Sequence, residues 1–247
     1  EEMQAPVVLM TNKVAVNHMP IEVLSNILLT LAHRSSTQVC VHLDHGTEIE
    51  VIAKALSAGY SSVMFDGSQL PMEENIEITN EVSSLARSYG ASVEAEIGSV
   101  GYSDPAVEAT ARYTTTQEAL TFYERTHIDA LAIAVGTVHR MESQGAVLQF
   151  DLLRSISKLI PTPLVIHGAS GVSDEDIPKL IAYGARKVNI GTALRMAFGT
   201  TLRTMYERYP QEYDRLRFYP SCMEAVYETA IEKFRLLQKP YEEQTHT

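Results

Sequence analysis

The sequence predicts an α/β fold, a TIM (β/α)8 barrel that lacks its first β-α unit in this chain. Short apolar runs rich in β-branched residues alternate with helical patterns through all 247 residues, which is the layout of parallel strands joined by helices. Most of the runs are continuous, as in strands buried on both faces. Polar residues gather at the carboxyl ends of several strands, which favours a barrel over the alternative, a doubly wound open sheet.

Seven strand-like runs alternate with seven helical stretches, one unit short of a closed barrel. We predict strands at Ala5–Met10, Val39–His45, Ser62–Gly67, Ser92–Gly98, Ala130–Thr137, Pro163–His167 and Lys187–Gly191. We predict helices at Ile21–Arg34, Glu48–Ala58, Met72–Tyr89, Thr116–Arg125, Phe150–Leu159, Asp174–Tyr183, Ala193–Tyr209 and, after a Tyr219-Pro220 break, Met223–Leu237.

Glycine, proline and serine mark several of these boundaries. Glycines after three helices favour a left-handed closing residue, prolines prevent one helix from continuing, and a serine before an acidic turn can cap another. In chain order these residues are Gly59, Gly90, Pro161, Pro163, Ser173 and Gly184. No linker separates a second domain, so we predict one barrel domain over residues 1–247, with a C-terminal helical extension from about residue 221.

The overall charge restricts the partners. Lys and Arg total 20 against 31 Asp and Glu, a net charge of −11, which repels nucleic acid and anionic membranes. Local backbone donors and a metal must therefore bind any anionic substrate. Cys40 and Cys222 form no paired motif, and we find no signal peptide or membrane-spanning run, so we expect a cytoplasmic protein.

Three histidines fall at the carboxyl ends of three predicted strands. His45 ends the run Val41-His42-Leu43-Asp44-His45, His139 follows the Ala130 strand, and His167 ends the Pro163 strand. Three neutral imidazoles with an open fourth position are typical of a catalytic zinc site. A single such histidine would more often be a hydrogen-bonded core residue, which is how we interpret His42.

Carboxylates accompany these histidines. Asp44 precedes His45, where it could either orient a histidine or serve as a general acid and base. Glu94 and Glu96 share one face of their strand. We expect Glu96, nearer the end of the strand, to support the metal or the substrate, and Glu94 to be structural.

Two loops of small residues lie after the last two strands. Gly168-Ala169-Ser170-Gly171 and Asn189-Ile190-Gly191-Thr192 both lead into helices, and loops of this kind commonly bind phosphate through backbone N–H groups. We place Lys187 at the start of its strand, at the stability end of the barrel. No lysine is thus expected to form a Schiff base, and metal-assisted carbanion chemistry is favoured.

These residues together resemble the class II, metal-dependent ketose-bisphosphate aldolases, particularly the tagatose- and fructose-bisphosphate members. The resemblance covers nearly the whole chain. Its ordered motifs are Ala5-Pro6-Val7-Val8-Leu9, His42-Leu43-Asp44-His45-Gly46, Val63-Met64-Phe65-Asp66-Gly67-Ser68, Glu73-Glu74-Asn75-Ile76, Val93-Glu94-Ala95-Glu96-Ile97-Gly98, Gly136-Thr137-Val138-His139, His167-Gly168-Ala169-Ser170-Gly171 and Lys187-Val188-Asn189-Ile190.

The resemblance implies an aldolase that cleaves a phosphorylated ketose reversibly to dihydroxyacetone phosphate and an aldehyde such as glyceraldehyde 3-phosphate. Zinc would be held by His45, His139 and His167, a monovalent cation is a further candidate, and Asp44 would be the proton donor. The metal would polarise the ketose carbonyl. The triose phosphate would bind Gly168, Ala169, Ser170 and Asn189, Ile190, Gly191, Thr192. The family is usually dimeric or tetrameric.

The chain departs from the family pattern at several positions. Arg140 replaces the usual glycine after the second zinc histidine, where it could either bind a substrate phosphate or crowd the site. Gly101-Tyr102 replaces a paired glycine in the loop after the Glu94 strand, and Met223 stands where relatives have a phosphate-binding arginine. The first strand and helix, which carry an asparagine motif, are missing. Alternatives are therefore an aldolase for a different phosphorylated keto-sugar or keto-acid, or a non-catalytic sugar-phosphate-binding barrel.

Overall fold

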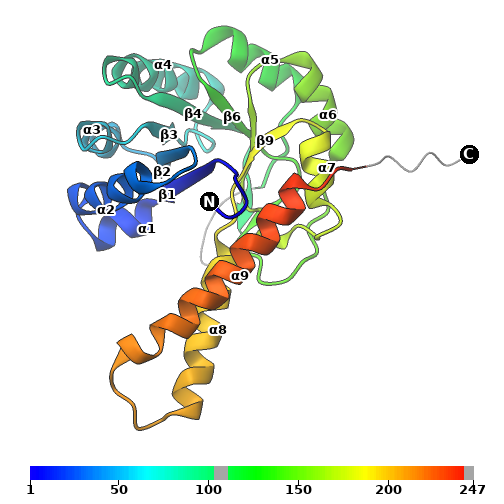
Figure 1. The fold of residues 1–247 in the computed structure, drawn as a ribbon. Helices are drawn as coiled ribbons and strands as arrows, with labels where there is room; N and C mark the ends of the chain where they lie inside the picture. The colour runs from blue at the N-terminus through cyan, green and yellow to red at the C-terminus, as the bar shows by residue number, and fades with distance from the viewer. Residues whose placement is uncertain (103–110, 242–247) are drawn as a thin grey trace, which may run out of the picture.

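Seven parallel strands form one curled sheet, an incomplete barrel, in a computed structural model that describes residues 1–102 and 111–241 (Figure 1). The strand order is β1-β2-β3-β4-β6-β8-β9, so among the described residues β1 and β9 are the two edges. The strands are β1 (Val7–Thr11), β2 (Val39–Gly46), β3 (Ser62–Phe65), β4 (Ser92–Ile97), β6 (Ala130–Ile133), β8 (Leu164–Ile166) and β9 (Ala185–Val188). The α/β class and the missing unit predicted from the sequence are confirmed.

Helices cover the outer side of this sheet and connect its strands (Figure 1). They are α1 (Lys13–His18), α2 (Ile21–Arg34), α3 (Ile49–Ser57), α4 (Met72–Ser88), α5 (Thr116–Arg125), α6 (Phe150–Leu159), α7 (Ile177–Ala182), α8 (Thr192–Arg208) and α9 (Tyr219–Gln238), with short 3-10 turns at Ala169–Gly171 and Arg215–Arg217. The helix α1 was not predicted; the Asn12 side chain caps it by accepting from the N–H of Ala15.

Local chemistry accounts for several helix ends. Thr115 and Glu118 form a reciprocal capping box at the start of α5. Pro220 lies in the first turn of α9, so the helix begins at Tyr219 and not at Met223 as predicted. Proline favours the first turn of a helix because the N–H it lacks would have no partner there.

The Ala130 strand is shorter than predicted. It ends at Ile133, and the chain turns at Gly136, whose φ is 107°. Val138 and His139 then form a separate strand, β7 (Val138–His139), which pairs in parallel with β5 (Gly101–Tyr102). His139 therefore enters the site from a small second sheet and not from a barrel strand.

The last strand lies earlier in the chain than predicted. Ala185 already pairs with Leu164, directly after Gly184 closes the preceding helix with a φ of 117°. The strand ends at Val188, which places Lys187 inside β9 and leaves Asn189 to Gly191 as a loop.

The hydrophobic core lies between the sheet and the helices. Val93, Ala95 and Ile97 of β4 are buried against it. On the opposite face of β4 lie Glu94 and Glu96, which are each 2% exposed. Since alternate residues of a strand point to opposite faces, these glutamates and their counterparts on other strands lie inside the barrel.

The helices α8 and α9 pack side by side as a hairpin that projects away from the barrel (Figure 1). We call residues 192–238 the arm. Within the described part of the chain, Cys222 is the one buried residue of these two helices. Across residues 1–102 and 111–241, no helix combines the length and the apolarity needed to cross a membrane.

Candidate active site

The three histidines converge at one end of the barrel. His45 lies near the end of β2, His139 ends β7 and His167 follows β8 directly. The ring centroids are 5.0 Å apart for His45 and His139, 4.6 Å for His45 and His167, and 6.1 Å for His139 and His167. One nitrogen of each ring lies within 4.8 Å of the other two, which is close enough for all three to bind one ion.

An irregularity in β2 lets neighbouring residues face the same site. Strand alternation alone would point Asp44 and His45 in opposite directions. The pairing of β2 with β3 shifts register between Leu43 and Gly46, and His45 has a left-handed φ of 52°. Such bulges redirect side chains, and here Asp44 Oδ2 comes to lie 3.9 Å from His45 Nε2.

The residues present fit a divalent ion such as zinc. His167 is fully buried, and its Nδ1 makes no hydrogen bond to any described residue. A buried polar atom without a partner is costly, and a ligand nitrogen would gain one on binding metal. Three imidazoles with a nearby carboxylate match the ligand types of catalytic zinc sites.

Two glutamates hold the ring of His167. Its Nε2 lies 2.8 Å from Glu94 Oε1 in a hydrogen bond, and its Nδ1 lies 3.0 Å from Glu96 Oε2. Burial alone would lower the pKa of His167, but the two carboxylates outweigh burial and raise that pKa to about 10. In the metal-free protein the ring is therefore protonated at neutral pH.

The pKa values of the other two histidines shift in opposite directions. Burial, together with the neighbouring rings of His45 and His167, lowers the pKa of His139 to about 3. Burial also opposes protonation of His45, but its Nδ1 bonds Asp66 Oδ2 at 2.6 Å and this contact raises its pKa. A carboxylate that holds the second nitrogen of a ligand histidine is a common partner in metal sites.

Asp44 is buried, with 7% of its surface exposed. Its Oδ1 accepts a hydrogen bond of 3.0 Å from Asn189 Nδ2. Burial raises the pKa of Asp44, but the nearby His45, His167 and Lys187 reverse this effect and lower it below the usual value. Asp44 is thus an ionised carboxylate beside the histidine cluster.

The two small-residue loops lie against each other beside this cluster. The N–H of Ala169 donates to the carbonyl of Asn189 at 3.2 Å, and the N–H of Ala193 donates to Ser170 Oγ at 3.1 Å. The second loop, Asn189-Ile190-Gly191, leads directly into α8, which begins at Thr192. The predicted phosphate loops therefore form one surface, with the N-terminus of α8 at its edge.

The positions that depart from the family pattern lie around His139 and in α9. Arg140 directly follows His139 and has a left-handed φ of 60°, a conformation that favours glycine. Tyr102 pairs with His139 across the small second sheet. Met223 lies within α9 and is 57% exposed; its correspondence to the phosphate-binding arginine of relatives stays a prediction.

Sequence reasoning missed three residues of the site. Asp66, the partner of His45, follows β3 directly, the same strand-end signal that identified the histidines. Glu94 was expected to be structural, but it contacts His167. The position predicted for Lys187 was wrong, because its Nζ reaches Glu94 Oε2 at 2.8 Å inside the barrel. His42 is buried and bonds Ser62, as predicted.

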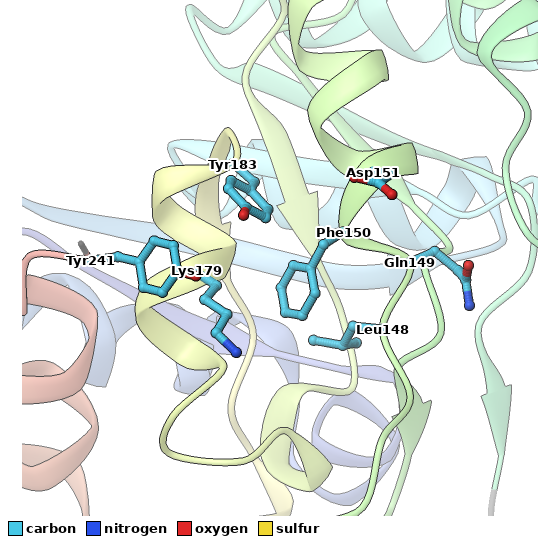
Figure 2. A pocket seen from close by; sticks show the side chains of 7 residues that line it. All are labelled: Leu148, Gln149, Phe150, Asp151, Lys179, Tyr183 and Tyr241. Atoms are coloured by element: carbon cyan, nitrogen blue, oxygen red, sulfur yellow. The ribbon is translucent and has the colours of Figure 1, made fainter. Parts of the chain in front are cut away.

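A separate hollow of about 340 Å³ lies beside α6 and α7 (Figure 2). Lys179 extends into it, 5.7 Å from the centre of the Phe150 ring, and its ammonium already pairs with Asp176 at 2.7 Å. The hollow contains no member of the histidine cluster. Its lining residues are Leu148, Gln149, Phe150, Asp151, Lys179, Tyr183 and Tyr241.

Comparison with known proteins gives a consistent result. The sequence model of the family described as fructose-bisphosphate aldolase class-II matches residues 1–240. The sulfofructosephosphate aldolase of Alkalicoccus urumqiensis is 34% identical over 239 residues, covering 96% of this chain and 83% of that protein. The 6-phospho-5-dehydro-2-deoxy-D-gluconate aldolase of Bacillus velezensis is 40% identical over 197 residues, covering 80% and 68%. The crystal structure of the YdjI aldolase from Escherichia coli K12 has a TM-score of 0.81 at 32% identity, covering 96% of this chain and 83% of that one.

Proposed function

The chain belongs to the class II fructose-bisphosphate aldolase family and is a carbon–carbon lyase, and we propose that it cleaves a phosphorylated ketose reversibly to dihydroxyacetone phosphate and an aldehyde. The observation that carries this proposal is the convergence of His45, His139 and His167 beside the buried Asp44. Family membership also favours this reading over a non-catalytic sugar-phosphate-binding barrel.

In the proposed site, His45, His139 and His167 hold one divalent ion, which we expect to be zinc. When bound, the ion supplies Lewis-acid polarisation of the ketose carbonyl. Glu94 and Asp66 fix the rings of His167 and His45 through the nitrogens that do not face the ion, and Glu96 lies on the Nδ1 side of His167. A monovalent cation remains a prediction.

Asp44 is proposed to move the proton of the reaction. In cleavage its ionised carboxylate takes the proton from the hydroxyl group that becomes the aldehyde, while the electrons of the breaking carbon–carbon bond shift toward the ketone. In the reverse direction it returns that proton. Asn189 supports the role, since its amide bonds one carboxylate oxygen at 3.0 Å and so keeps Asp44 in position.

The phosphate is proposed to bind where the two small-residue loops meet. Gly168, Ala169, Ser170 and Asn189, Ile190, Gly191, Thr192 bring backbone donors and the α8 N-terminus to one surface. Arg140 is proposed as an additional phosphate contact because it follows a metal ligand directly.

The substrate is proposed to be tagatose or fructose 1,6-bisphosphate, with a different phosphorylated keto-sugar or keto-acid as the second candidate. The replacement of glycine by Arg140 favours the second candidate. So do the two similar relatives, whose names refer to sulfofructose phosphate and to 6-phospho-5-dehydro-2-deoxy-D-gluconate.

We also propose that copies of the chain associate as a homodimer or homotetramer. The arm projects from the barrel (Figure 1). Several of its large apolar side chains are exposed. Exposed apolar surface of this kind is typical of an association site. These side chains are Met196, Tyr206, Tyr209, Tyr213, Leu216, Met223 and Tyr227.

The test is release of dihydroxyacetone phosphate by the zinc-loaded protein from four compounds: tagatose and fructose 1,6-bisphosphates, sulfofructose phosphate and 6-phospho-5-dehydro-2-deoxy-D-gluconate. We expect chelator-sensitive release from at least one. Asp44→Asn should keep stoichiometric zinc and lower the rate on the order of 10²- to 10⁴-fold. Asp151→Asn, a change outside the site, should match the unaltered protein. An unchanged rate in Asp44→Asn would exclude the proton-transfer role.

A further inference from the structure

We infer that Lys187 is a positioning residue, whose ammonium holds Glu94 so that Glu94 can set the ring of the metal ligand His167. The inference rests on the metal site proposed above. It concerns a lysine that does not touch the three-histidine cluster and that sequence reasoning placed at the other end of the barrel.

One buried carboxylate connects Lys187 to His167. Glu94 is 2% exposed, and its two oxygens have different partners. Oε1 accepts from His167 Nε2 at 2.8 Å, and Oε2 accepts from Lys187 Nζ at 2.8 Å. The chain of contacts thus joins β9, β4 and the residue that follows β8.

The contact with Glu94 decides which nitrogen of His167 is available. A neutral imidazole carries one N–H, and a carboxylate partner keeps that hydrogen on the nitrogen it contacts. Because Glu94 contacts Nε2, the lone pair is on Nδ1. Glu96 Oε2 lies 3.0 Å from this nitrogen but forms no hydrogen bond with it, so Nδ1 has no hydrogen-bond partner among the described residues.

Lys187 is needed because Glu94 would otherwise be held at one oxygen only. An unpaired charge inside a protein is costly, and a carboxylate held at one point can rotate toward other partners. His42 Nε2 lies 3.8 Å from Glu94 Oε2, too far for a hydrogen bond, and His42 is already bonded to Ser62 through Nδ1. Lys187 therefore supplies the close positive contact that keeps Glu94 facing His167.

The geometry of β9 explains how a lysine from this strand reaches the site. Lys187 and Asn189 are two residues apart and their side chains lie on the same side of the chain, since Asn189 bonds Asp44 and Lys187 bonds Glu94. The Lys187 side chain is 17% exposed. The segment from Lys187 to Asn189 thus positions two carboxylates. Asn189 holds Asp44, the proposed proton carrier, and Lys187 holds Glu94, which contacts the proposed metal ligand His167.

The experiment measures zinc affinity of the metal-free protein by competition with a chromophoric chelator. Lys187→Met keeps a long unbranched side chain and removes its charge, and it should weaken zinc binding by about 10- to 100-fold. Lys187→Arg keeps the charge and should restore affinity to within about threefold. Lys179→Met removes a lysine from an ion pair with Asp176 outside the site, and it should bind zinc as the unaltered protein does.

Thermal unfolding of each metal-free variant separates positioning from folding. If Lys187→Met fails to fold, Lys187→Gln provides the same test, because it also removes the ammonium that contacts Glu94. Glu94→Gln keeps the shape of Glu94 and removes the charge that Lys187 holds. A double variant carrying Glu94→Gln and the folded Lys187 change should bind zinc no more weakly than the weaker single variant, since both act through one contact. Independent, additive losses would overturn the inference.

The outcomes distinguish this inference from the proposed function. If the unaltered protein binds no zinc, the proposed metal site is wrong. If it binds zinc stoichiometrically and a folded Lys187→Met binds zinc equally well, the metal site stands and the positioning role of Lys187 is excluded.

Discussion

Individual side chains set the protonation of the candidate site before any metal binds. Glu94 and Glu96 surround His167 and raise its pKa to about 10, whereas burial and its ring neighbours lower the pKa of His139 to about 3. Two ligands with the same chemistry therefore start in opposite states near neutral pH. Metal binding needs both rings neutral, so His167 must lose a proton and His139 need not.

We predict that zinc binding releases about one proton or more per ion at pH 7. The apparent zinc affinity should rise as pH rises from 7 to 9, by about tenfold per unit for one proton, because the pKa of His167 lies above this range. The raised pKa of His45 acts in the same direction. Calorimetry in buffers of different ionisation enthalpy measures the proton release, and binding without proton release would contradict the assigned states.

Arg140 is expected to contact a substrate phosphate. Arg140→Ala should raise KM by about 10-fold or more, because a charged hydrogen bond contributes roughly 1.5–3 kcal/mol, and zinc content should not change. Arg125→Ala is the matched control, since Arg125 pairs with Glu73 on the outer surface. Steady-state kinetics on the best substrate gives both values, and a KM equal to that of the control would remove Arg140 from the substrate site.

At the scale of elements, tight turns bring the strand ends together. Gly168 has a φ of 65° and lies directly after His167. A Cβ on Gly168 would meet the carbonyl carbon of Val138 at 2.8 Å and the nitrogen of His139 at 3.0 Å. The barrel strand that leads to His167 and the small strand that carries His139 can approach because this residue has no side chain.

Gly168→Ala should therefore lower both stability and zinc affinity. We expect a loss of about 1–3 kcal/mol in the free energy of unfolding, together with weaker zinc binding because the His139 backbone must move. Gly90→Ala is the control: Gly90 has a φ of 70° but no atom within 4 Å of an added Cβ. Gly90→Ala should affect stability alone, by about 1 kcal/mol. Unchanged zinc affinity in Gly168→Ala would show that the close contact is not needed for the site.

At the scale of the whole molecule, the two helices of the arm bury fewer of their side chains than the barrel helices α2 to α7 do. Tyr213 and Leu216, between α8 and α9, are 87% and 65% exposed. The barrel helices, in contrast, bury apolar residues against the sheet. A projecting hairpin with this surface is explained if a second copy of the chain covers it.

Light scattering tests this explanation. A combined Tyr213→Lys and Leu216→Lys variant should shift the molecular mass from that of an oligomer toward that of one chain, because a buried unpaired charge opposes association. Leu159→Lys is the control, since Leu159 is 42% exposed at the end of α6 on the barrel. An oligomer that persists in the double variant would exclude these two residues from the interface.

The sequence by itself determined the order of strands and helices and the residue types of the site. Periodicity, capping residues and helix-ending glycines are local signals, so they identified most of the elements to within a few residues. The sequence predicted that His45, His139 and His167 meet at one end of the barrel beside Asp44. The structure brings the three histidines within reach of one ion, although His139 arrives on a small second strand and not on a barrel strand. The chemistry of these residues follows from their types alone.

Only the tertiary structure decided how those side chains are held. The contacts of Glu94 with His167 and Lys187 span 73 and 93 residues of sequence, and nothing local to either residue indicates them. The bulge at Asp44-His45 and the separate strand of His139 likewise depend on pairing with distant segments. Charges become buried, and pKa values shift, only when strands far apart in the chain close around them.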